Sequence, residues 1–188
     1  MKTILSFFRI CVVSCIFLSG CSSNAGKMIS KQLDAKMLNS KLETQTIDLS
    51  VDSKCSETKS VRVVNGELNT DKYCIDHAMG GCRWYIIPKD FTNDIVKYIE
   101  NRLIAGNIKV GSGSDIIVSL EELKSQEGAW TFGSTCKIKV EISDINYIQT
   151  YIGESGGPLG YHAAAYAIHL AVDSFFKDPV FQSYIKCQ

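Results

Sequence analysis

The sequence predicts an α+β domain with a mostly antiparallel sheet and two main helices packed on one face. Apolar and polar residues alternate in several short segments, most clearly over residues 136–142, which is typical of strands with one buried face. Two longer segments, 90–106 and 161–176, repeat apolar residues at helical spacing. The resulting order of strands, helix, several strands and helix favours α+β over alternating α/β.

The first twenty residues are predicted to be an export signal. Lys2 and Arg9 provide positive charge, and an apolar stretch of eleven residues follows at 10–20. At 1.5 Å per residue this stretch spans only about half of a bilayer core, so it fits a signal peptide better than a transmembrane helix.

Leu18-Ser19-Gly20-Cys21 resembles the lipobox of bacterial lipoproteins, in which a peptidase cuts before the cysteine. The resemblance implies diacylglycerol on the Cys21 sulfur and an N-acyl chain on its amino group, an attachment that anchors a protein without a spanning helix. An ordinary secretory signal followed by a chance cysteine is the alternative. By analogy with Gram-negative lipoproteins, Ser22 in place of Asp favours the periplasmic face of the outer membrane.

Without residues 1–20 the chain carries 18 Lys and Arg against 20 Asp and Glu, which excludes a basic nucleic-acid binder. Residues 21–45 are polar and are predicted to be a tether. Four apolar residues there also allow a short amphipathic helix formed against a partner: Ile29, Leu33, Met37 and Leu42. Residues 46–188 are predicted to form one domain.

The first half of the domain is predicted to contain strands at 47–51, 61–64 and 83–87. The second of these ends at the turn signal Asn65-Gly66, and residues 68–81 are expected to be irregular. A helix follows, capped by Asp90 and stopped by Gly106. Its buried face is predicted to comprise Ile95, Tyr98, Ile99, Leu103 and Ile104.

The second half is predicted to contain further strands at 108–110 and 115–120, joined across 111–114, then at 130–132, 136–142 and 147–152. In the strand 136–142, Cys136 faces the core. A loop is expected at 153–160, then the helix 161–176. Asp178-Pro179 breaks the chain before a short helix at 180–185.

Five cysteines follow Cys21, namely Cys55, Cys74, Cys82, Cys136 and Cys187. An oxidising compartment favours disulfides, and the odd number leaves at least one free or paired with another chain. Cys74–Cys82 is the favoured pair because the loop is short and contains Gly80-Gly81. Its closure would stabilise the fold by about 2.5 kcal/mol.

Two patterns raise the question of chemistry. The segment Gly153-Glu154-Ser155-Gly156-Gly157-Pro158 resembles the nucleophile segment of trypsin-like proteases, which implies Ser155 as the nucleophile. A hydrolase of another kind could use Ser155 with His162 or His169 as the base. The remaining protease pattern is missing, and the chance composition of a Gly/Ser loop is the alternative. His162 and His169 lie roughly 10.5 Å apart along a helix, too far for one metal.

Cys74, His77 and Cys82 have the residue types of a zinc site. They provide three ligands rather than four, and a disulfide competes for the same sulfurs. A disulfide is therefore the favoured interpretation, and a metal site is the alternative.

From Asp90 to Ile185 the chain resembles the YajG-type lipoproteins, which share a design with auxiliary lipoproteins of envelope ABC transport. The resemblance rests on the helix end Leu103-Ile104-Ala105-Gly106, the alternating strands, and the closing segment Phe176-Lys177-Asp178-Pro179-Val180-Phe181. It implies a transport-accessory role and brings no catalytic residues. The region containing Cys55, Cys74 and Cys82 departs from the family.

Together these patterns predict a membrane-anchored envelope lipoprotein, not an enzyme, that binds an envelope protein or lipid and needs no cofactor. A periplasmic thiol or metal protein using Cys74, His77 and Cys82 is the first alternative. A serine hydrolase using Ser155 is the second.

Overall fold

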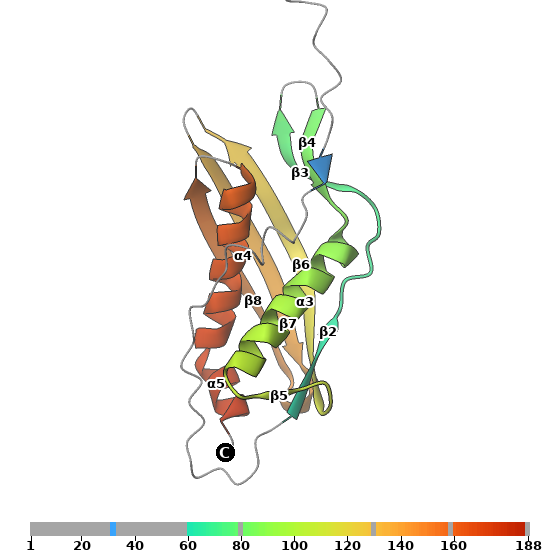
Figure 1. Cartoon of the computed structure of the whole chain (residues 1–188), viewed down its shortest axis with the longest axis vertical. Helices are drawn as coiled ribbons and strands as arrows, with labels where there is room; N and C mark the ends of the chain where they lie inside the picture. Colours follow the sequence, from blue (N-terminus) through green and yellow to red (C-terminus); the bar gives the residue numbers. More distant parts are fainter. Residues whose placement is uncertain (1–30, 33–59, 79–80, 129–130, 158–159, 187–188) are drawn as a thin grey trace, which may run out of the picture.

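The structure is a computed structural model that describes residues 31–32, 60–78, 81–128, 131–157 and 160–186 (Figure 1). The predictions for the signal peptide 1–20, Cys21, the strand 47–51, Cys55 and Cys187 lie outside these ranges, as does most of the tether 21–45. Within the described residues the α+β class is confirmed, with three helices and an eight-stranded sheet. None of these helices is long and apolar enough to cross a membrane.

The elements follow one another along the chain in this order: β1 Lys31–Gln32, β2 Ser60–Asn65, β3 Tyr73–Ala78, β4 Gly81–Ile86, α3 Pro88–Ala105, β5 Lys109–Val110, β6 Ser114–Glu127, β7 Phe132–Ile142, β8 Tyr147–Gly157, α4 Gly160–Lys177 and α5 Pro179–Ile185. A single 3-10 turn, Ser143–Ile145, joins β7 to β8. Both long helices, α3 and α4, lie on one face of the sheet, as predicted (Figure 1).

The sheet is mostly antiparallel, as predicted, but it is mixed because several strands pair in parallel. The long strand β6 pairs with β7 on one side, and β7 pairs with β8, both antiparallel. On its other side β6 pairs with two parallel strands, β2 near its start and β3 near its end. β1–β4 and β2–β5 are also parallel. The β3–β4 hairpin and α3 separate β2 from β6 along the chain, which makes the crossover long enough for parallel pairing.

Asn65-Gly66 ends β2, as predicted, but leads into no hairpin with the next strand. Instead the Gly66 amide donates to the Val118 carbonyl of β6, at 2.8 Å. The strands predicted at 108–110 and 115–120 are present as β5 and β6, and β2 lies between them. Their connection therefore passes the first residue of β2, where a Cβ on Gly113 would overlap the Ser60 carbonyl oxygen.

Helix α3 begins at Pro88, earlier than predicted. Its first turn contains Asp90, while Ile87 occupies the cap position without a side-chain hydrogen bond. Proline suits the first helical position because an amide hydrogen there would have no acceptor within the helix, so nothing is lost when proline lacks it. The buried face is as predicted except for Ile104, which is 58% exposed. The helix ends at Ala105 with Gly106 as its C-cap, and the residue in the left-handed conformation is the next one, Asn107.

Three segments differ from the predicted strands and loops. Residues 73–78 form β3 rather than irregular structure, because they pair with β4. Phe132 belongs to β7, so there is no separate strand before it among the described residues. Residues 153–157 extend β8 rather than forming a loop. Their backbone groups are hydrogen-bonded to β7, and this pairing outweighs the low strand propensity of the glycines.

Aromatic side chains fill the core at one end of α4. Phe175, Phe176 and Phe181 are fully buried, and the rings of Phe175 and Phe181 lie 4.0 Å apart between centroids. Tyr151 of β8 packs against Phe175 at 5.5 Å. We call these four residues the apolar end. Helix α5 closes it, with Asp178 capping the helix through the amides of Val180 and Phe181.

Candidate functional site

Cys74 and Cys82 form a disulfide that joins β3 to β4, with their Cα atoms 5.7 Å apart, so the predicted pairing is confirmed. His77 lies beside it, with Nδ1 3.7 Å from the Cys74 sulfur. The bond occupies both sulfurs that the alternative zinc site would need. Among the described residues, no group of three or more His, Cys, Asp or Glu is arranged to hold a metal ion.

A buried carboxylate, Asp76, lies next to this disulfide. Its side chain is fully buried, and neither oxygen has a hydrogen-bond partner in the described part of the chain. The Arg83 Nε lies 3.5 Å from one oxygen. Burial raises the pKa of Asp76 and the Arg83 guanidinium opposes that rise. Asp76 is therefore a carboxyl group that is shielded from water and lies beside the Arg83 guanidinium.

Arg83 links this carboxylate to the rest of the sheet. It forms an ion pair with Glu127 and lies over the Phe132 ring, 5.6 Å from its centroid. Ser125, the register partner of Asp76, accepts a 3.0 Å hydrogen bond from Ser134. A Cβ on Gly160 would lie 3.4 Å from the Ser125 hydroxyl, so Ser125 lies next to the first turn of α4.

We call this region the polar end of the sheet. It comprises Cys74, Asp76, Cys82, Arg83, Ser125, Glu127 and Ser134. The arrangement attaches the β3–β4 hairpin to β6 and to the start of α4, which is a structural role.

Ser155 lies in a regular strand and not on the loop that the protease-like segment would need. It is half-buried in β8, directly opposite Ser134 of β7. The ladder continues on both sides, through Glu154 with Thr135 and Gly156 with Gly133. A serine nucleophile needs an exposed position on a sharp turn beside an oxyanion hole, and Ser155 does not have such a position.

The two histidines of α4 lie apart, as their spacing predicted. His162 lies near the N-terminal end of the helix and His169 near its middle. His169 shares a 2.7 Å hydrogen bond with the Tyr98 hydroxyl of α3. Burial lowers the pKa of His169, and the positive charge of Arg102 adds to the effect.

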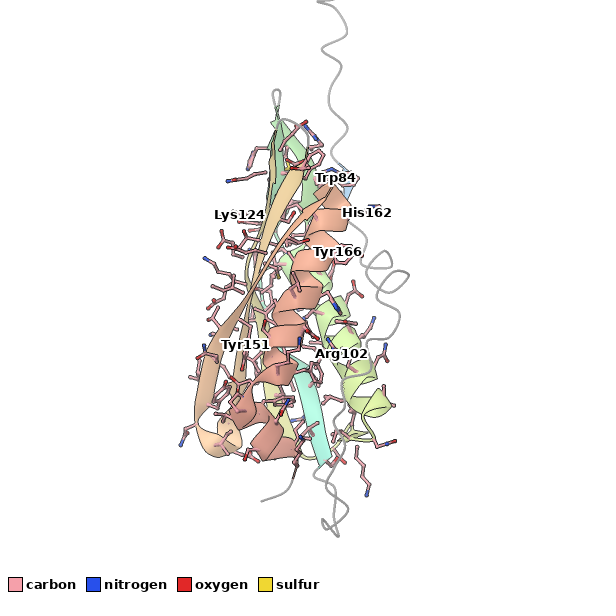
Figure 2. All side chains as sticks on the ribbon, turned by 90° about the vertical axis from the view of Figure 1, so that its left-hand side faces the viewer. Trp84, Arg102, Lys124, Tyr151, His162 and Tyr166 are labelled. Carbon is pink, nitrogen blue, oxygen red and sulfur yellow. A yellow bond between two sulfur atoms is a disulfide. The ribbon has the colours of Figure 1, made fainter. Side chains whose placement is uncertain are left out.

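An ion pair completes this contact between the two long helices. Arg102 donates to Asp173 at 2.9 Å, and its guanidinium lies 4.6 Å from the centroid of Phe176. Burial alone would raise the pKa of Asp173, but hydrogen bonds from Lys177 and Arg102 hold it below its ordinary value. Figure 2 shows Arg102 on the helical side of the sheet, facing α4. His169 thus belongs to the packing of α3 on α4.

Cys136 is a free thiol and is fully buried in β7, on the predicted face. Burial raises its pKa to about 12, with a contribution from Glu122. The neutral thiol is a poor nucleophile, so Cys136 behaves as a small core residue.

The face of the sheet opposite the helices is open and polar. In Figure 2 Lys124 projects from it, away from His162 and Tyr166. Glu122 forms ion pairs there with Lys124 and Lys137, both at 2.6 Å. A shallow hollow of about 400 Å³ lies near the polar end. Two cross-strand partners among its lining residues, Gly133 and Gly156, have no side chains.

The strand β8 forms one border of this face. Among the described residues it pairs with β7 alone, over its full length. Two large apolar side chains project from it to the open face, Ile148 and Ile152, which are 65% and 52% exposed. The sequence predicted only the first half of this strand.

Sequence reasoning missed the Asp76–Arg83 pair. No signal in the sequence identifies Asp76 as buried, since its neighbours in 73–78 lack a regular alternation. The only indication in the sequence that this segment is ordered came from Gly80-Gly81 and from the predicted bridge between Cys74 and Cys82.

No family model matches the chain, and no curated protein matches it. The resemblance to YajG-type lipoproteins therefore stays a prediction.

Proposed function

We propose that this chain is a lipoprotein of the bacterial envelope, anchored by lipid on Cys21, that acts by binding an envelope protein or lipid and not by catalysis. The observation that carries the anchor is Leu18-Ser19-Gly20-Cys21 at the end of the apolar stretch. Three acyl chains on one cysteine provide stable membrane attachment, whereas a single chain binds only reversibly.

The use of the reactive side chains supports a binding role. Cys74 and Cys82 are consumed in a disulfide, and His169 joins α3 to α4. Ser155 lies within a ladder of paired strands. The border strand β8, in contrast, presents two exposed apolar side chains on the open face, Ile148 and Ile152.

The anchor is tested by metabolic labelling with a palmitate analogue. Cys21→Ser should abolish labelling and release the protein from the membrane fraction, because the sulfur that carries the lipid is gone. Cys15→Ser, in the apolar stretch, is the matched control and should label normally. Unchanged labelling of Cys21→Ser would show that the lipid-anchor proposal is wrong.

The leaflet is tested separately by density-gradient fractionation. Outer-membrane sorting predicts that the native chain sediments with the outer membrane, and that Ser22→Asp shifts it to the inner membrane in a Gram-negative host. A native chain found in the inner membrane would contradict the outer-membrane assignment while leaving the anchor intact.

The binding role is tested by a crosslinked pull-down of the full-length protein from detergent-solubilised envelope, with Cys21→Ser as control. We expect a reproducible protein or lipid partner that the control loses. An enzymatic turnover by the native protein that Ser155→Ala abolishes would contradict the non-enzymatic proposal.

A further inference from the structure

The strand β1 begins ten residues after the proposed lipid attachment at Cys21. It pairs with β4, where Lys31 lies opposite Trp84. The same row of the sheet continues through Asp76 of β3 to Ser125 of β6. Lys31 is therefore level with the polar end of the sheet, and Figure 1 shows β1, in blue, beside β4 at this end of the molecule.

The number of residues between Cys21 and Lys31 limits which part of the domain reaches the membrane. Ten residue steps of at most about 3.6 Å span no more than about 36 Å, and a flexible chain of that length spans on average about half as much. The opposite end of the sheet begins at Ser114 of β6, eleven residues from Ser125 and roughly 37 Å away along the strand. With lipid on Cys21, the polar end stays near the membrane, whereas the opposite end reaches it only when the connecting chain is fully stretched.

The side chains beside β1 are of the kinds that gather at membrane surfaces. Trp84 and Tyr85 are the register partners of β1 and are half-buried, and Tyr73 at the start of β3 is 41% exposed. Lys72 is exposed and holds its ammonium 4.6 Å from the centroid of the Tyr85 ring. Trp and Tyr rings have an apolar body and a polar tip, so they favour the headgroup level of a bilayer, where Lys also places its charge. We call these four residues the aromatic edge.

The tyrosines at the opposite end of the sheet are used within the fold instead. The Tyr147 hydroxyl donates to Asp178 at 2.7 Å and shares a 2.6 Å hydrogen bond with the Tyr151 hydroxyl. Tyr184 donates to Asp144 at 3.3 Å. These rings therefore serve the packing of the apolar end, and the aromatic edge is the group that the short connection to Cys21 holds near the membrane.

We propose that the aromatic edge contacts the phospholipid headgroups of the membrane in which Cys21 is anchored, so that the polar end faces the membrane and the apolar end points away from it. The Lys72 ammonium pairs with headgroup phosphate, and the exposed parts of the Tyr73 and Trp84 rings lie among the headgroups. This inference rests on the proposed function, because it requires the anchor, and it names a lipid surface as the partner of this part of the domain.

The first test measures how close each end lies to the membrane by fluorescence quenching. The full-length, lipidated protein is bound to vesicles of phosphatidylethanolamine and phosphatidylglycerol that contain a lipid with a nitroxide on its headgroup. Trp130→Phe leaves Trp84 as the one tryptophan of the chain. In the matched control both tryptophans are replaced by phenylalanine, and Ile145→Trp places the reporter at the opposite end, at a position that is 41% exposed. We expect the emission of Trp84 to fall by about half and that of the control to stay unchanged.

The second test removes the positive charge of the aromatic edge. Lys72→Gln should lower the fraction of molecules in contact about fivefold, which is the effect of one elementary charge near an anionic surface, and the quenching of Trp84 should fall with it. Lys72→Arg retains the charge and should retain the quenching. Lys109→Gln is the matched control, since Lys109 is also exposed but lies on β5 at the opposite end. The melting temperature should stay unchanged in all three variants.

The outcomes separate this inference from the proposed function. Flotation of the protein with the vesicles, lost in Cys21→Ser, reports on the anchor alone. A protein that floats but shows equal quenching at positions 84 and 145, or stronger quenching at 145, would overturn the inference while the anchor stands. Quenching of Trp84 that Lys72→Gln leaves unchanged would also overturn it. A protein that does not float would contradict both.

Discussion

The two ends of the sheet are stabilised by different kinds of interaction. At the apolar end, Phe175, Phe176 and Phe181 pack with Tyr151 through ring contacts of 4.0–5.6 Å between centroids. At the polar end a disulfide, a buried carboxylate and an ion pair occupy the corresponding place. Helix α4 connects the two, with its first turn at the polar end and its last at the apolar end (Figure 1).

The difference shows that one end of this domain is stabilised mainly by the packing of buried rings, and that the other depends on a disulfide and on buried charge. Apolar packing is insensitive to pH and to reducing agents, whereas the polar end contains a reducible bond and a carboxylate with a raised pKa. Conditions that act on charge or thiols should therefore loosen the β3–β4 hairpin first.

The largest effect is expected from Phe175→Ala at the apolar end. Removing a fully buried ring leaves a cavity and should lower the free energy of unfolding by about 3–5 kcal/mol, measured by urea denaturation. Phe132→Ala is the matched control at the polar end, where the ring is half-buried. An equal loss in the free energy of unfolding for both variants would show that the two ends do not differ in the stability that their aromatic rings provide.

Gly153→Ala tests the contact between β8 and α4 that joins the two ends. The added Cβ would overlap the helix backbone, so the helix must move, at a cost of about 3 kcal/mol. Gly133→Ala is the control, since a Cβ there has no atom within 4 Å. If both variants have the same melting temperature, α4 is less closely packed on β8 than described.

Removal of the disulfide tests the polar end. Cys74→Ser with Cys82→Ser should lower the free energy of unfolding by about 2.5 kcal/mol. Hydrogen exchange should increase in β3 and β4 and stay unchanged in α5. A uniform increase throughout the domain would show that the hairpin does not open separately.

The smallest effect concerns pH. Because the folded state raises the pKa of Asp76 above its ordinary value of 3.8, the folded protein binds this proton more readily than the unfolded chain. Its contribution to stability is therefore most favourable below pH 3.8 and is lost as the pH rises through the folded pKa. Asp76→Asn should remove this dependence in thermal melts recorded across that range.

Prediction from sequence succeeded where a segment's own pattern decides its structure. The strand at 136–142 and the helix at 161–176 were found because apolar residues recur at the period of each element. The disulfide was found because a short loop with glycines leaves few alternatives. These are local properties of the chain.

Prediction from sequence failed where the structure of a segment depends on pairing with residues far away along the chain. Residues 153–157 contain three glycines and were expected to form a loop, but β7 provides partners for their backbone groups. The parallel pairing of β2 with β6 depends on a crossover that no short pattern encodes. The buried state of Asp76 likewise depends on Arg83 and Ser125, which come from two other strands.

The position of β2 between β5 and β6 constrains the order in which the chain folds. β5 and β6 are separated by three residues, yet Arg62 of β2 pairs with Asp115, 53 positions later. The segment from β6 to α4 is contiguous and dominated by antiparallel neighbours, so it can form without β2. We therefore expect β2 to insert after β6, β7 and β8 have paired, and its amides to exchange by partial opening before those of β7. If the chain is exported unfolded, as the proposed function implies, this late closing step takes place after the whole domain has crossed the membrane.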